Sequence, residues 1–319
     1  MRLTKIRTIS LLWMICLIIQ AVAQESALAA QGEISYCCKE YPLERNGFSL
    51  HLDCVSAGVP ELGRQILLLH GSSYSSHEFD IDYQDYSLVR FLARQGYAVW
   101  RLDIAGYGKS GQVEDGFMPD TAYAVEDICA AADEIRRNSG QEQIDILGWS
   151  WGTMTAGIFT VDHPEYVRKL VLYAPILSGL GEQEVKEPFS HNTWEGAAED
   201  FQKQEDGAFD PEITDSILIE LFCSSCWHYD GDSSPNGWSR DVFVDNNTRL
   251  IDLERINVPT LVIYGSKDPY MNHKLLNEAF ELLPEGSRVQ EIEGGSHILM
   301  YEKPYYRDFQ ERDVSFLNQ

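Results

Sequence analysis

The stretch ILGWSWGTMTAG, residues 146–157, places Ser150 between two glycines, at the end of an apolar run and directly before a helical pattern. Two residues that can cooperate with a serine follow later apolar runs: Asp268 after TLVIYG (260–265) and His297 after RVQEIEG (288–294). A serine hydroxyl is a weak nucleophile until a base takes its proton, and a histidine oriented by a carboxylate is suited to that task. These residues predict acyl transfer, with Ser150 as nucleophile, His297 as base and Asp268 as orienting acid.

For each of these three residues a purely structural role is the alternative to a catalytic one. Ser150 can be an ordinary turn serine, His297 a surface-loop histidine, and Asp268 a turn former in front of Pro269. Glu291 and Glu293 are other candidates for the acid, but they lie along the last apolar run rather than beyond its end. We expect Asp103 to tie down the loop that follows it.

The elements that must position these residues alternate along the chain. Short apolar runs occur at 48–55, 65–70, 97–103, 143–149, 169–175, 260–265 and 288–294. Helical patterns lie between most of them, at 86–96, 121–140, 151–165, 274–286 and 305–317. This alternation predicts an α/β fold with a mostly parallel central sheet flanked by helices. In such a sheet the chemistry lies beyond the carboxyl ends of the strands, where all three residues are expected.

From about Ser35 to the C-terminus, apart from one insertion, the chain resembles the α/β-hydrolase family. In that family a G-x-S-x-G sequence forms the nucleophile elbow, a strained strand-to-helix turn, and the triad follows in the order Ser, Asp, His. The resemblance implies an oxyanion hole made by the backbone N–H groups of Trp151, which follows the nucleophile, and of Ser72, which follows His70-Gly71. It also implies that His70 orders the oxyanion loop.

The alternating pattern predicts a division of the chain into four parts: a leader (1–23), a core in two pieces (24–175 and 257–319) and an inserted lid (176–256). The insertion is rich in aromatic residues, and its segments 190–204 and 215–230 have helical patterns. We expect most of these aromatic residues to pack the lid itself, with Trp194 and Trp227 joining Trp149 at an apolar substrate pocket. A small to medium, uncharged substrate fits this interpretation.

The N-terminal segment has the pattern of a secretory signal peptide. Arg2, Lys5 and Arg7 precede an uncharged apolar run that ends in Ala21-Val22-Ala23, so cleavage is predicted after Ala23. Cleavage near Ala27–Ala29 and an uncleaved membrane anchor are the alternatives. A secreted or periplasmic protein without a stable membrane span is therefore expected. The net charge of −25 disfavours nucleic acid and anionic lipid as partners.

The six cysteines beyond the leader permit disulfides in an oxidising compartment. The sequence predicts one bridge from Cys54 to Cys37 or Cys38, a second from Cys223 to Cys226, and a buried free thiol at Cys129. The alternative is that all six are reduced. No residue cluster has metal-ligand spacing and no glycine-rich loop has a phosphate-binding context, so neither a metal nor a cofactor is expected.

The favoured function is a serine hydrolase that cleaves a small-molecule carboxylic ester through an acyl-enzyme. A second hypothesis is an aminopeptidase, because Gly-x-Ser-Trp-Gly resembles the elbow of proline iminopeptidases, and Glu195 and Glu199 are candidates for binding an α-amino group. The loop His70-Gly71-Ser72-Ser73 departs from the His-Gly-Gly-Pro-Gly pattern of that family. A non-catalytic binding protein on the same fold is the third hypothesis, and an intact triad argues against it.

Overall fold

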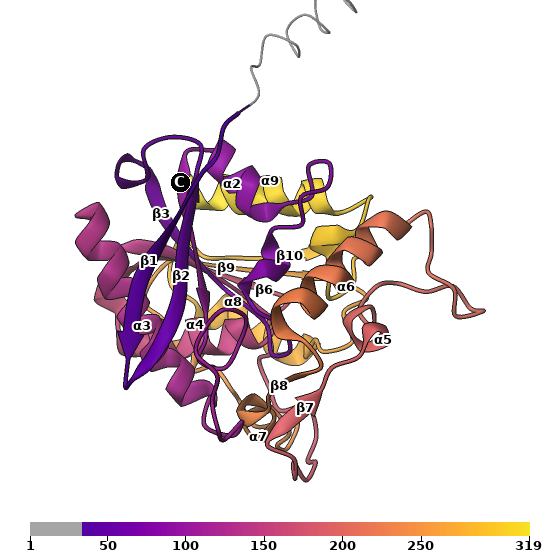
Figure 1. The fold of residues 1–319 in the computed structure, drawn as a ribbon. Helices are drawn as coiled ribbons and strands as arrows, with labels where there is room; N and C mark the ends of the chain where they lie inside the picture. The colour runs from indigo at the N-terminus through magenta and orange to yellow at the C-terminus, as the bar shows by residue number, and fades with distance from the viewer. Residues whose placement is uncertain (1–33) are drawn as a thin grey trace, which may run out of the picture. The chain divides into compact units, whose positions relative to one another are not determined.

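An eight-stranded sheet crosses the computed structural model, which describes residues 34–319 (Figure 1). The strand order is β1-β2-β4-β3-β5-β6-β9-β10. The strands are β1 (Cys37–Arg45), β2 (Phe48–Ser56), β3 (Arg64–Leu69), β4 (Tyr97–Asp103), β5 (Ile144–Trp149), β6 (Val167–Tyr173), β9 (Thr260–Gly265) and β10 (Arg288–Ile292). From β4 to β10 all neighbours pair in parallel, whereas β1 and β2 form an antiparallel edge. The predicted leader and its cleavage site lie outside the described residues.

The central strands read as apolar runs because helices cover both faces of a parallel sheet. All six residues of β5 and of β9 are buried, as are all seven of β4. Strand β1 was not expected from the sequence, since its residues CCKEYPLER are mostly exposed and show no apolar run. It is held by pairing with β2 along its whole length.

Two hydrophobic cores lie on opposite faces of the sheet. One contains α3 (Thr121–Ser139), α4 (Trp151–Asp162) and α8 (His273–Leu282), and the other contains α2 (Leu88–Arg94) and α9 (Tyr306–Leu317). Figure 1 shows α2 and α9 side by side, away from α3 and α4. Short 3-10 helices occur at η1 (Pro60–Leu62), η2 (Ser76–Phe79), η3 (Pro164–Tyr166), η4 (Leu253–Arg255) and η5 (Leu299–Tyr301).

The insertion, residues 176–256, connects β6 to β9 and contains short elements around one longer helix. These are β7 (Phe189–His191), α5 (Trp194–Ala197), α6 (Ser216–Asp230), β8 (Ser233–Pro235) and α7 (Gly237–Val242). The predicted helix at 215–230 is present as α6. The predicted helix at 190–204 is wrong, because only the single turn α5 forms there and β7 pairs with β8. Residues Tyr36–Gln319, insertion included, form one compact unit.

The structure contradicts both predicted disulfides. The register places Cys37 opposite Ser56 and Cys38 opposite Val55, and both cysteines are exposed free thiols. Cys223 and Cys226 are buried free thiols on the inner face of α6. Cys129 is a free thiol as predicted, but it is half-buried rather than buried.

No helix within residues 34–319 is both long enough and apolar enough to cross a membrane.

Candidate active site

Ser150 occupies a strained turn between β5 and α4. Its backbone angles, φ of 56° and ψ of −123°, lie in a region that residues other than glycine rarely adopt. The turn is held from both sides: the Ser150 N–H donates to the carbonyl of Tyr173 at 3.1 Å, and the Thr153 N–H donates to the carbonyl of Ser150 at 2.9 Å. Strain that surrounding strands maintain in this way is typical of functional sites.

The two glycines of this elbow are required by close backbone approaches. A Cβ at Gly148 would lie 2.2 Å from the carbonyl oxygen of Gly152, and a Cβ at Gly152 would lie 2.2 Å from that of Leu69. These distances are well below van der Waals contact. The spacing Gly-x-Ser-x-Gly therefore has a steric cause, since α4 begins directly against the end of β3.

A buried acid–base pair forms beyond β9 and β10. His297 Nδ1 lies 2.8 Å from Oδ2 of Asp268, and the other carboxylate oxygen accepts the backbone N–H of Tyr270 at 3.0 Å. Burial of His297 lowers its pKa, but the Asp268 carboxylate outweighs that effect, so the pKa of His297 is raised above its usual 6.5. Asp268 therefore fixes the orientation of the imidazole and stabilises its protonated form.

The loop that carries His297 is fastened by aromatic side chains of the core. Trp149 Nε1 and the Tyr173 hydroxyl both donate to the carbonyl of His297, at 3.1 and 2.9 Å. The ring of Tyr270 meets the imidazole edge to face at a centroid distance of 4.7 Å. Trp149 thus both lines the pocket, as predicted, and holds the backbone of the candidate base.

The loop after β3 brings Ser72 to the same pocket, and His70 orders its first turn. His70 Nε2 lies 3.1 Å from the N–H of Ile104 and therefore accepts its hydrogen, so Nδ1 carries the proton and donates to the carbonyl of Gly71 at 2.8 Å. Burial lowers the pKa of His70, which favours this neutral form. The Tyr107 hydroxyl donates to the carbonyl of Ser72 at 2.8 Å. The role expected for His70 has a direct structural basis in these contacts.

Trp151 is the first residue of α4, where backbone N–H groups have no acceptor within the helix. Its indole is buried and donates to Thr121 Oγ1 at 2.9 Å. Trp151 and Ser72 border the same pocket as Ser150. The predicted pair of oxyanion donors therefore lies at this pocket, with Trp151 at the start of α4 and Ser72 on the loop after β3.

Ser150 and His297 border a cavity of about 500 Å³, and residues of the insertion line the same cavity. Core residues at its wall include Trp149 and Ile298, and insertion residues include Phe222, Trp238 and Phe243. The cavity has the size of a small-molecule site. The insertion thus supplies a large part of the cavity wall.

Acidic residues at this cavity were largely missed by the sequence analysis. Glu78, Glu199 and Asp200 line it, whereas no lysine or arginine of the described chain does. Glu78 is buried and accepts the N–H of Gly71 at 2.7 Å, and burial raises its pKa well above the usual range. Burial also raises the pKa of Asp200. Of the two insertion glutamates predicted to bind an amine, Glu199 lines the cavity and Glu195 does not.

The prediction that Trp194 and Trp227 line the substrate pocket is wrong. Both indoles are exposed, to 42% and 49%, and they border a second, shallow recess that shares residues 191–193 with the wall of the cavity. For Trp227 the reason is the orientation of α6, which turns Phe222 and Cys226 toward the core and leaves Trp227 on its outer face, whereas Trp194 lies exposed at the start of α5. The aromatic content of the insertion alone did not distinguish these two faces.

Comparisons with known proteins agree with this fold. A family model described as alpha/beta hydrolase fold matches residues 65–217. The chain is 34% identical over 115 residues to a proline iminopeptidase from Lactobacillus delbrueckii subsp. bulgaricus, a match that covers 35% of this chain and 36% of the relative. The matched stretch is thus about a third of the length of that relative.

Two further similarities extend over most of the chain. Epoxide hydrolase 4 of Mus musculus is 24% identical over 330 residues, which covers 94% of this chain and 86% of the relative. The crystal structure of naproxen esterase (carboxylesterase NP) from Bacillus subtilis has a TM-score of 0.61 at 20% identity and covers 88% of this chain and 92% of that chain. At such identity the structural similarity concerns the fold alone.

Proposed function

Because this chain is an α/β hydrolase by fold, as its sequence predicted, we propose that it is a serine hydrolase that cleaves a carboxylic ester. The observation that carries the proposal is the buried contact of His297 with Asp268 at 2.8 Å, at a cavity that also contains the strained Ser150. The same residues serve three needs of acyl transfer: a nucleophile, a base and an orienting acid.

The proposed reaction begins when His297 takes the hydroxyl proton of Ser150 and Ser150 Oγ attacks the ester carbonyl. The tetrahedral oxyanion accepts hydrogen bonds from the backbone N–H groups of Ser72 and Trp151. Collapse breaks the bond to the alcohol, which leaves with the proton from His297, and forms the acyl-enzyme. Water then gives a proton to His297 and attacks the acyl carbonyl. Collapse breaks the bond to Ser150 Oγ, which takes the proton back from His297 as the carboxylic acid leaves.

The cavity supports a substrate of small to medium size. Its volume of about 500 Å³ and its aromatic wall suit a compact acyl or alcohol group. The absence of lysine and arginine from the described wall disfavours an anionic substrate. We further infer that the insertion acts as a lid and that the protein is exported, the latter from the signal-peptide pattern of its leader.

A serine-directed probe and a panel of esters test the proposal. Purified protein should hydrolyse p-nitrophenyl acetate or butyrate faster than the octanoate, and a fluorophosphonate should add covalently to Ser150, as located by peptide mass spectrometry. Ser150→Ala should lose both signals. A protein that neither reacts with the fluorophosphonate nor hydrolyses an ester would instead support the non-catalytic binding protein considered above.

An aminopeptidase is the second candidate, and the carboxyl groups of Glu199 and Asp200 at the cavity favour it. Ionised carboxylates bind a substrate ammonium, and the matched relative is a proline iminopeptidase. A prolyl arylamide separates the two candidates. If the aminopeptidase reading holds, Glu199→Gln should raise KM for the arylamide about tenfold or more and leave KM for a neutral ester within about twofold.

A further inference from the structure

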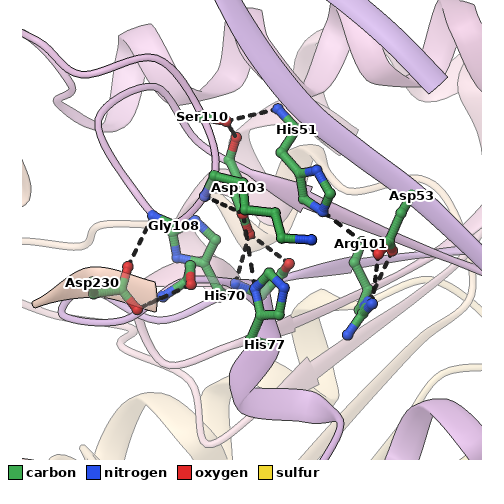
Figure 2. Close-up of polar contacts among 12 residues, drawn as sticks. His51, Asp53, His70, His77, Arg101, Asp103, Gly108, Ser110 and Asp230 are labelled. Atoms are coloured by element: carbon green, nitrogen blue, oxygen red, sulfur yellow. Dashed lines mark hydrogen bonds and ion pairs between the residues drawn. The ribbon is translucent and has the colours of Figure 1, made fainter. Parts of the chain in front are cut away.

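Asp230, the last residue of α6, joins the insertion to two loops of the core. Its Oδ2 accepts hydrogen bonds from the backbone N–H and the hydroxyl of Ser75, both at 3.0 Å. Its Oδ1 accepts the N–H of Gly108 at 2.9 Å, the contact that Figure 2 shows between these two residues. One carboxyl group therefore bridges the loop after β3 and the loop after β4.

Asp103 holds the same two loops from inside the core. Its carboxylate accepts the N–H and the hydroxyl of Ser76, at 3.0 and 2.5 Å, and the N–H of Lys109 at 3.0 Å. Ser75 and Ser76 are consecutive, so the end of the loop is fixed by one carboxyl from the core and one from the insertion. Ser72, at the cavity, lies three residues upstream on this loop.

Other insertion residues act on the same loop. The Ser234 hydroxyl donates to the carbonyl of Ser73 at 2.5 Å. The Tyr107 hydroxyl lies 2.8 Å from the carbonyl of Ser72 and 3.0 Å from that of Pro235. The position of the loop thus depends on residues 230–235 as well as on the core.

We propose that Asp230 is a positioning residue, which fixes the loop Gly71–Ser76 and through it the backbone N–H of Ser72. The catalytic part of this inference rests on the proposed function, in which Ser72 supplies an oxyanion donor. The carboxyl does not touch the cavity, so Asp230 acts through the loop rather than on the substrate.

The chemistry of the contact requires a carboxylate. Oδ1 of Asp230 faces an N–H group, and Oδ2 faces an N–H group and a hydroxyl. An amide therefore loses at least one hydrogen bond from an N–H group, and a protonated carboxyl accepts these bonds less strongly. Burial and the nearby Asp103 nevertheless raise the pKa of Asp230 to about 7. Protonation near neutral pH should therefore loosen the loop.

Several ionisable groups surround this contact and belong to its titration. His77 of η2 lies 3.9 Å from Asp103, and its pKa is lowered to about 4 by burial, so it is neutral at pH 7. Its ring stacks on Tyr229 of α6 at a centroid distance of 3.4 Å, and the Lys109 ammonium lies 5.8 Å from the Tyr229 ring. The other ionisable groups near the contact are Tyr74, Glu78, Tyr107 and Cys226.

Asp230→Asn tests the inference, with Asp232→Asn as the matched control on an exposed side chain two residues away. We expect Asp230→Asn to lower kcat for a good ester about 10- to 100-fold and to keep KM within about twofold, because a displaced oxyanion donor weakens the transition state and not substrate binding. The slope of log kcat against pH below pH 7 should fall from two toward one, since the side chain at position 230 no longer titrates. The control should match the wild type in kcat and slope.

Amide hydrogen exchange followed by mass spectrometry tests the positioning without any activity. In Asp230→Asn the peptide containing residues 71–76 should exchange at least about tenfold faster than in the wild type and in Asp232→Asn, with little change in peptides from β5 and β9. Unchanged exchange in that peptide overturns the inference. Faster exchange in a protein whose wild type cleaves no ester or amide retains the positioning role and refutes the proposed function instead. A kcat unaffected by the substitution, in an active enzyme, refutes the catalytic part.

Discussion

At the residue scale, Ser150 and His297 carry the first prediction. Ser150→Ala and His297→Ala should each reduce ester turnover by about 10⁴-fold or more, because the nucleophile and its base act as a unit. Steady-state kinetics with p-nitrophenyl butyrate measures this, and circular dichroism checks that the fold is intact. Either variant retaining more than a few per cent of wild-type activity contradicts the assignment.

The acid is the second residue with a testable role. Asp268→Asn should lower turnover by about 10⁴-fold, because an amide stabilises the wrong imidazole tautomer. Glu291→Gln is the matched control: Glu291 is exposed and pairs through its backbone with Tyr264 on β9, so its carboxyl does not serve the imidazole. A large loss in the control with little loss at Asp268 would move the acid to β10.

The pH profile follows from the raised pKa of His297. A base must be neutral to accept a proton, so kcat/KM should fall on the acid side with a midpoint above the usual 6.5 of histidine. Removal of the negative charge in Asp268→Asn should shift that midpoint downward. A wild-type midpoint below 6.5 in rate measurements from pH 5 to 9 would show that Asp268 does not control His297.

At the element scale, the approach of α4 to β3 makes Gly152 intolerant of a side chain. A Cβ there would lie 2.2 Å from the carbonyl of Leu69 and 2.6 Å from that of His70, so Gly152→Ala must displace backbone. We expect a loss of about 2–3 kcal/mol in unfolding free energy, measured by denaturant titration. Gly58→Ala, with nothing within 4 Å of the added Cβ, should change stability by less than about 0.5 kcal/mol.

Whether a strand or helix could be predicted from the sequence depended on what stabilises it. The fully buried strands β4 and β9 were predicted with their observed bounds, because a strand covered on both faces consists of apolar residues. Strand β1 was not predicted from the sequence because pairing with β2, and not burial, stabilises it. The helix predicted at 190–204 is absent because residues 190–191 belong to β7, which pairs with β8, and only the single turn α5 follows.

The candidate triad was predictable from the sequence because parallel strands place their carboxyl ends at one edge. The cavity wall was not, since it depends on which face of α6 turns inward and on the path of the chain around it. Glu78 is an example of a cavity residue that the sequence did not predict. It lies eight residues beyond His70 in a stretch without a pattern, and only the fold of η2 brings its carboxyl to Gly71.

At the scale of the whole molecule, buried acids set the pH dependence of stability. Burial raises the pKa of Asp313 well above the usual range, and neither of its carboxyl oxygens has a hydrogen-bond partner within residues 34–319. The unfolded chain restores an ordinary pKa near 3.8, so unfolding releases a proton and native stability falls as pH rises above that value.

Asp313→Asn should therefore reduce the fall in Tm between pH 6.5 and pH 8. The histidines His70 and His77 contribute little to the change in Tm over this range, because their pKa values in the folded protein are lowered. Calorimetry at several pH values measures the effect. Glu311→Gln, an exposed position on the same helix, should leave the slope unchanged. An equal slope in Asp313→Asn and the wild type would show that Asp313 is ionised in the native protein.

The connection from β6 to β9 also dictates an order of events during synthesis. Strand β6 can pair with β5 as soon as it is made, but its other edge stays open until the ribosome has added the entire insertion and then β9. The open edge carries the buried residues of Val167–Tyr173, which can pair with other chains. The acid and the base follow β9, so a nascent chain with a finished elbow has no catalytic partners. Under the proposed function such a chain cannot yet complete acyl transfer, and the open edge of β6 is covered only when β9 pairs with it.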